Sequence, residues 1–148
     1  MRILKAFLLV FPAALAAYAI GSVASSQFVI AAHEAVFDIE VTGAERLSMT
    51  LFDVANMWLY FAIIAIGFLI AFPIAAGLKR LLPGLAGIAY PLAGAAAIGT
   101  ALGLMLTLLG IVPISGARST LGFAAQMLAG GVGGYVFALT ATRRTTPS

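Results

Sequence analysis

Residues 54–78, VANMWLYFAIIAIGFLIAFPIAAGL, decide the fold class, and the basic pair Lys79-Arg80 follows them directly. The stretch contains no Asp, Glu, Lys or Arg. It exceeds the ~20 apolar residues that a helix needs to cross ~30 Å of hydrocarbon. A backbone in lipid has no water to bind, so a spanning segment satisfies its own polar groups by forming a helix. This stretch therefore predicts a transmembrane α-helix.

Three further apolar runs have no charge in their middle: residues 3–26, 84–109 and 120–142. Together with 54–78 they predict an all-α fold, a bundle of four transmembrane helices. Residues 1–148 would form a single integral membrane domain, with residues 27–53 as a small cap outside the bilayer. Hydrophobic residues make up 63% of the chain and charged residues only 9%, against about 25% charge in soluble domains.

Charge gives the orientation. Six basic residues flank the spans on one side, whereas Arg46 and Arg118 lie on the other; the six are Arg2, Lys5, Lys79, Arg80, Arg143 and Arg144. By the positive-inside rule we expect both termini in the cytoplasm and residues 27–53 outside it. We expect a bacterial inner membrane because the chain is small and its loops are short. Basic pairs at span ends are topology signals, so we expect no nucleic-acid partner.

The first span has a competing interpretation. Its basic start, apolar run and Ser22-Val23-Ala24 resemble a cleavable signal peptide. The apolar run is longer than a usual signal core, so we expect the segment to be retained.

The loop 27–53 contains all five acidic residues of the chain. Residues 37–41 and 46–51 each alternate between apolar and polar side chains around Gly43, which favours a short β-hairpin. The alternative is a helix, because Leu47, Leu51 and Val54 also share a helical face. In that case Thr50 and Asp53 would cap the second membrane helix. We expect irregular or hairpin structure up to residue 50.

Small residues recur at four-residue steps in every span, as at Gly122, Gly130 and Gly134 in the fourth. Positions four apart share a helix face, so each helix has a smooth stripe along which backbones can approach closely. We expect packing within one bundle. The alternative is that these three glycines, with a GxxxG spacing at 130–134, join copies of the chain into a homo-oligomer.

Four polar residues are expected at the outer ends of the second and fourth helices: Arg118, Gln126, Asn56 and Tyr60. They predict either ordinary interhelical hydrogen bonds or an outer vestibule in which Arg118 holds an anionic group. We favour the hydrogen bonds. Thr100 and Thr107 are expected to bond back to their own helix.

The sequence contains no catalytic motif: HExxH, GxSxG and a phosphate loop are all absent. Cysteine is also absent, which excludes disulfides, thiolate metal sites and a Cys nucleophile. His33, Asp38 and Glu40 match no metal-ligand spacing. We therefore predict no catalytic residue, no metal and no cofactor.

Three functions remain as hypotheses. The favoured one is a non-enzymatic accessory or assembly subunit that contacts membrane lipid and a partner membrane protein. The second is a small oligomeric channel or carrier with an outer vestibule around Arg118. The third, an intramembrane enzyme acting on lipid through His33 or Glu34, has the least support.

Overall fold

The computed structural model describes the backbone of residues 2–143 and the side chains of residues 8–141. This part of the chain is all-helical: α1 Arg2–Phe37, α2 Gly43–Asn56, α3 Trp58–Leu81, α4 Ala89–Leu109 and α5 Thr120–Arg143. Short 3₁₀ turns, η1 Pro83–Leu85 and η2 Ser115–Ala117, precede α4 and α5. The four long helices α1, α3, α4 and α5 are each long and apolar enough to cross a membrane. The predicted all-α membrane helix bundle is confirmed.

Helix α1 continues well beyond residue 26, where the predicted first span ends. It has 36 residues, or about 54 Å at 1.5 Å per residue. Residues 27–37 contain no Gly or Pro and several alanines, so nothing local stops the helix. It ends before Asp38, whose positive φ of 51° turns the chain back.

The hairpin predicted within residues 27–53 is wrong. Residues 43–56 form α2, which begins with a capping box. The backbone N–H of Glu45 donates to Thr42 Oγ1 (3.4 Å), and the N–H of Thr42 donates to Glu45 Oε2 (3.0 Å). The capping box satisfies two orphan donors at the helix start, and this local signal outweighs the period-2 alternation.

The predicted cap of the second membrane helix is wrong too. Thr50 lies inside α2 and donates to the carbonyl of Arg46 (2.8 Å). Helix α3 begins at Trp58 after a break at Met57, which has no side-chain cap bond. At the other helix ends, α4 begins five residues after the predicted residue 84, whereas α5 matches residues 120–142 closely. Gly110 ends α4 with a φ of +69°, a conformation that glycine adopts without strain.

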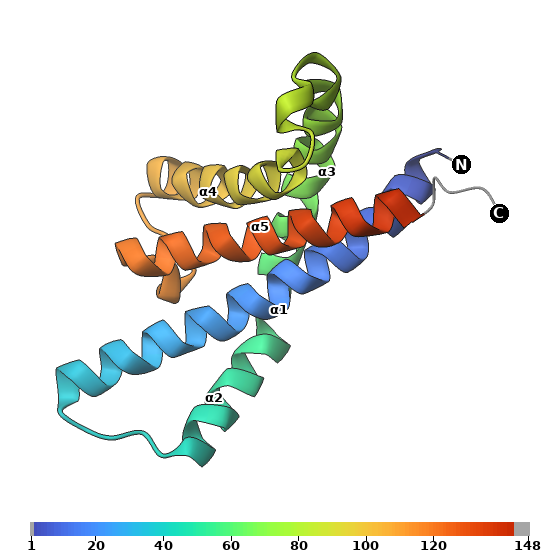
Figure 1. The fold of residues 1–148 in the computed structure, drawn as a ribbon. Coiled ribbons are helices and arrows are strands. Elements are labelled where there is room, and N and C mark those ends of the chain that lie inside the picture. The colour runs from blue at the N-terminus through green and yellow to red at the C-terminus, as the bar shows by residue number, and fades with distance from the viewer. Residues whose placement is uncertain (1, 144–148) are drawn as a thin grey trace.

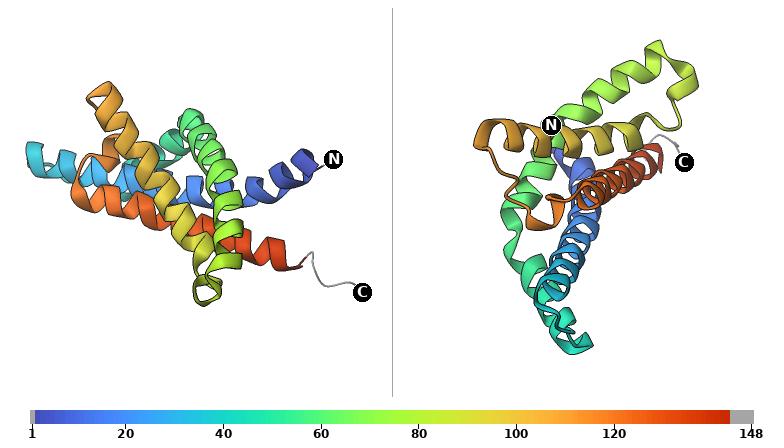
Figure 2. Two further views of the ribbon diagram at one scale, coloured as in Figure 1. Left: turned by 90° about the horizontal axis from the view of Figure 1, so that it is seen from above. Right: turned by 90° about the vertical axis from the view of Figure 1, so that its left-hand side faces the viewer.

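The packing centres on α5, which lies between α4 and α1 (Figure 1) and contacts both. The N-terminal end of α1 and the C-terminal end of α5 lie at the same end of the molecule in Figures 1 and 2. Helix α3 runs transverse to α4 and α5 in Figure 1 and packs on α4 and α1. Buried aromatic side chains of α3, Phe68 and Phe72, fill the centre.

The glycine stripe of α5 faces other parts of the same chain. A Cβ on Gly130 would lie 2.4 Å from the carbonyl oxygen of Gly94 in α4, and one on Gly134 would lie 2.0 Å from that of Tyr90. A Cβ on Gly122 would lie 1.8 Å from the carbonyl oxygen of Gly116 in η2. The three positions proposed to join copies are therefore occupied by the chain's own backbone, which is the packing alternative we favoured.

Candidate functional site

A row of buried polar groups runs along one face of α1. Ser22, Ser25 and Ser26 are all buried, and their spacing of three and four residues places them on one helical face. The row begins with Tyr18, and beyond Ser26 the half-buried Gln27 and Glu34 bond to α2, which lies alongside α1. We call this row and its partners the polar seam. Bonds along it connect α1 to α2, α3, α5 and the turn at η2.

Gln126 is the centre of the seam inside the bundle, and its side chain is 0% exposed. Its Oε1 accepts a hydrogen bond from the hydroxyl of Tyr60 (2.6 Å), and its Nε2 donates to the carbonyl of Gly21 (2.9 Å). One amide thereby ties α5 to α3 and to α1. Gly21 leaves room for it, because a Cβ there would lie 2.6 Å from Gln126 Oε1. The oxygen and the nitrogen of the Gln126 side chain thus each have a hydrogen-bond partner on another helix. We call Gln126, Tyr60 and Gly21 the lock.

Farther along α1 the serines connect to loops and to α2. Ser25 Oγ accepts from the backbone N–H of Gly116 (3.3 Å). Ser26 Oγ lies 2.7 Å from Asp53 Oδ2 and 3.0 Å from the carbonyl oxygen of Ser22, and its single proton serves one acceptor at a time. The hydroxyl of Tyr18 donates to the carbonyl of Val54. Ser22 Oγ is buried without a partner.

The seam ends in a helical hairpin, which we call the arm: residues 27–37 of α1 together with α2. Arg46 donates to both carboxylate oxygens of Glu34 (2.8 Å each) and to Gln27 Oε1 (2.9 Å). Gln27 Nε2 donates to Thr50 Oγ1 (3.1 Å). The hydroxyl and backbone of Thr42 both donate to Glu45 and lower its pKa below 4.5. Polar bonds thus connect the two helices of the arm, in which Ile30 is also fully buried.

The outer side of the arm is apolar. Leu51 is 60% exposed and Phe52 is 67% exposed, and no residue of α2 is buried. The other exposed apolar side chains there are Val36, Phe37, Ile39, Leu47 and Met49. The arm therefore exposes many apolar side chains on its outer side, while a partly exposed ion pair lies between its two helices.

Only two of the four predicted vestibule residues come together, Tyr60 and Gln126. Asn56 is exposed and its Nδ2 donates to the carbonyl of Phe52 (2.8 Å), because the break at Met57 removes it from the face of Tyr60. Arg118 precedes α5 rather than lying on it, so the expected face shared with Gln126 does not exist.

Arg118 nevertheless lies beside an open depression. Its Nε donates to the carbonyl of Val112 (3.1 Å). The depression has a volume of about 570 Å³ and is also lined by Ser119 and Thr120. It lies at the turn between α4 and α5, and Gln126 is not among the residues that line it.

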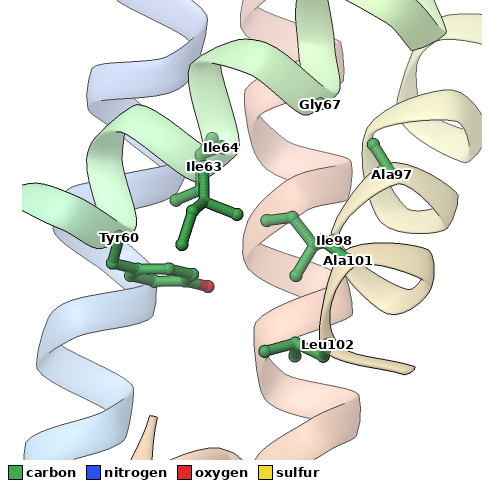
Figure 3. Close-up of a pocket in the computed structure, with 8 residues that line it drawn as sticks. All are labelled: Tyr60, Ile63, Ile64, Gly67, Ala97, Ile98, Ala101 and Leu102. Atoms are coloured by element: carbon green, nitrogen blue, oxygen red, sulfur yellow. The ribbon is translucent and has the colours of Figure 1, made fainter. Parts of the chain in front are cut away.

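The bundle has a cavity between α3 and α4 of about 10 Å³, shown in Figure 3. Tyr60, Ile64 and Ile98 are among its walls. Such a volume is about that needed for one water molecule. It is too small for a solute.

The other residues singled out from the sequence are scattered. His33 is exposed, with its ring centroid 4.6 Å from that of Phe37. Thr107 bonds back to Gly103 in its own helix (3.1 Å), as predicted, whereas Thr100 is exposed on α4. Within the described residues, no group of three or more His, Asp or Glu side chains is placed to hold a metal ion.

The sequence interpretation missed the seam. It did not connect Ser22, Ser25 and Ser26 with one another or with Asp53. Three serines on one face of an otherwise apolar helix are the signal that would have found it, because polar groups in a span need partners.

Fold and site define an integral membrane helix-bundle protein with an internal polar seam and an apolar-faced arm. Neither the protein-family models nor the curated proteins nor the solved structures contain a match to this chain.

Proposed function

We propose that the chain is a non-enzymatic accessory or assembly subunit, and that the outer side of the arm binds a partner membrane protein. The observation that carries this proposal is the exposed apolar surface on the outer side of the arm. The charged side chains of α2 are all engaged: Glu45 in the cap, Arg46 with Glu34, and Asp53 with Ser26. The exposed surface of α2 therefore consists mostly of apolar side chains.

A membrane partner fits this surface better than a soluble one. The apolar side of α2 leads directly into the start of α3, where Trp58 is 69% exposed and Leu59 is also exposed. These two residues are the first of α3, which is long and apolar enough to cross a membrane. Trp is enriched at the membrane interface. A partner that covers Leu51 and Phe52 would therefore extend along the bilayer boundary. Contiguous apolar surface of this kind marks interaction sites.

We infer the expected orientation for this subunit: termini in the cytoplasm and the arm outside it, in a bacterial inner membrane. Six basic residues against two support the orientation. The N-terminal end of α1 and the C-terminal end of α5 lie at the same end of the molecule (Figure 1), which agrees with an even number of crossings. Small size and short loops support the location.

Photocrosslinking in intact cells tests the proposal. A photoreactive residue replaces Leu51 or Phe52, and matched probes replace Leu128 and Val132, which are exposed on α5. We expect the arm probes to crosslink one membrane protein in fixed ratio and the α5 probes to give lipid adducts. A charged substitution, Leu51→Glu, should abolish the crosslink formed from position 52. Lipid adducts alone from all four positions would refute the proposal.

The depression beside Arg118 favours a second candidate function, a small oligomeric channel or carrier. Exposed Arg118 offers an anion a positive charge near Ser119 and Thr120. Purified protein in liposomes should then pass a small anion, and Arg118→Ala should stop the flux while Asn56→Ala should not. Absence of flux from folded protein would eliminate this candidate.

A further inference from the structure

A long apolar groove lies between α3 and α4, apart from the arm and the seam. Its volume is about 670 Å³. Small residues of the two helices form its floor, among them Gly67, Ala71, Ala93 and Ala97. Larger side chains line it as well, including Ile66, Ile70, Ile74, Leu92 and Leu104. The groove lies where α3 and α4 pack against each other at an angle (Figures 1 and 2).

The groove has the length of a lipid chain. Its α3 side runs from Ile63 to Leu78, about 22 Å at 1.5 Å per residue. One leaflet contributes about half of the ~30 Å of hydrocarbon. An acyl chain that enters at one end of the groove would therefore remain inside it across its own leaflet.

One end of the groove is basic. Leu78 and Leu85 line this end, and Lys79 and Arg80 lie between them in the chain. Lys79 Nζ lies 4.6 Å from the ring centroid of Tyr90, which holds the ammonium at the start of α4. Arg80 is exposed.

Nothing acidic neutralises this end. All five acidic residues of the chain lie between residues 34 and 53, in α1, α2 and the loop between them. None lies near Lys79 and Arg80 in the sequence. The pair is therefore a net positive charge at the mouth of an apolar groove, which complements the charge pattern of an anionic phospholipid.

We propose that this groove binds an anionic phospholipid, with one acyl chain between α3 and α4 and the phosphate at Lys79 and Arg80. The apolar floor takes the chain and the basic end selects the head group. A second copy of the protein would fill the apolar groove equally well. It would leave Lys79 and Arg80 unpaired, because the chain's acids lie elsewhere.

Lipid titration of the full-length protein in detergent, followed by native mass spectrometry, tests the head group. The two probes are palmitoyl-oleoyl phosphatidylglycerol and palmitoyl-oleoyl phosphatidylcholine, which share their acyl chains. Near-surface basic residues contribute about fivefold each to anionic lipid binding. We expect K79Q/R80Q to lose at least tenfold in affinity for the glycerol lipid and little for the choline lipid. The control R143Q/R144Q removes the same number of basic charges elsewhere in the sequence and should change neither.

A filled groove tests the acyl chain. Ala96 lines the groove and is exposed, so Ala96→Phe adds bulk there without entering the core. It should abolish binding of both lipids, whereas Val132→Phe on exposed α5 should not. Thr100→Phe, at another exposed lining position, replaces Ala96→Phe if that variant loses its helical circular dichroism.

Three results would overturn the proposal. The first is equal affinity of K79Q/R80Q and R143Q/R144Q for the glycerol lipid. The second is undiminished lipid binding by a folded groove-filling variant. The third is a dimer of the native chain that Ala96→Phe dissociates, since a second copy would then occupy the groove.

Discussion

The bundle and the arm are held together in different ways. Between α4 and α5, backbone lies close to backbone at Gly94, Gly130 and Gly134. In the arm, α1 and α2 are connected by Arg46, Gln27 and Glu34, and α2 contains no buried residue. Close packing of helix backbones therefore holds α4 and α5 together, whereas hydrogen bonds and an ion pair connect the two helices of the arm.

The contrast indicates what each region needs. Close backbone packing gains dispersion contacts that persist in lipid or detergent, where no hydrophobic drive brings helices together. A partly exposed ion pair contributes little, in general 0–1 kcal/mol. The bundle should therefore be stable by itself, whereas the arm should depend on what covers its apolar outer side. Four predictions sharpen or break this contrast.

The largest effect should come from overfilling the glycine contact. Gly134→Leu places a Cβ 2.0 Å from the Tyr90 carbonyl oxygen and forces α4 and α5 apart. We expect a loss of about 3 kcal/mol or more in the free energy of unfolding, measured by denaturation in detergent. Gly131→Ala is the control, since its Cβ would lie 3.6 Å from the nearest atom, and should be neutral or slightly stabilising. Equal stability of the two variants would contradict the packing role.

The second effect concerns the lock at Gln126. Gln126→Leu leaves the Tyr60 hydroxyl and the Gly21 carbonyl without their partners. Membrane hydrogen bonds average ~0.6 kcal/mol each, with a maximum of ~1.7, so we expect a loss of about 1–2 kcal/mol in the same assay. Asn56→Leu, at an exposed position, should cost less than ~0.5 kcal/mol. Combining Gln126→Leu with Tyr60→Phe should add little, and full additivity would argue against the lock.

A smaller and more local effect is expected in the arm. Arg46→Met removes the bonds to Glu34 and Gln27 but touches nothing in the bundle. Amide hydrogen exchange should become faster in residues 43–56 and stay unchanged in α5, and the unfolding midpoint should hardly move. Faster exchange throughout the chain would show that arm and bundle form one cooperative unit.

The smallest effect is a dependence of α2 on pH. The bonds from Thr42 lower the pKa of Glu45 in the folded chain, so the stabilisation by its carboxylate is present above the unfolded pKa near 4.5. It is lost as pH falls through the lower, folded pKa. A spin label on Ser48→Cys, in a chain without other cysteines, should therefore become more mobile as pH falls below about 4.5. Glu45→Gln should weaken this dependence, and an unchanged pH profile would count against the capping box as its source.

The four transmembrane helices could be predicted because the mean hydropathy of each segment depends only on its own residues. The ends of α5 were predicted almost to the residue, since Thr120 and the basic end mark them in the sequence. The start of α3 was not predicted, because Val54 and Ala55 are apolar enough to belong to either helix. Only the break at Met57 separates them, and no residue type there announces it.

Among the polar residues, too, some contacts could be predicted from the sequence and others could not. Gln126 and Tyr60 were expected in one outer cluster of four residues, with Arg118 beside Gln126 and Asn56 beside Tyr60 by helical spacing. That argument failed once the chain broke at Met57 and α5 began at Thr120, after Arg118. The partners of Ser25 and Ser26 are distant in the sequence, at Gly116 and Asp53, so no local pattern connects them.

The sequence by itself determined that this is an all-helical membrane protein with four apolar helices, because length and hydropathy of each segment settle that question without reference to the others. Only the tertiary structure decided that Gly122, Gly130 and Gly134 face α4 and η2, that an ion pair connects the two helices of the arm, and that a groove lies between α3 and α4. These features depend on the direction in which each helix leaves its turn, and that direction is set by contacts among all the helices at once.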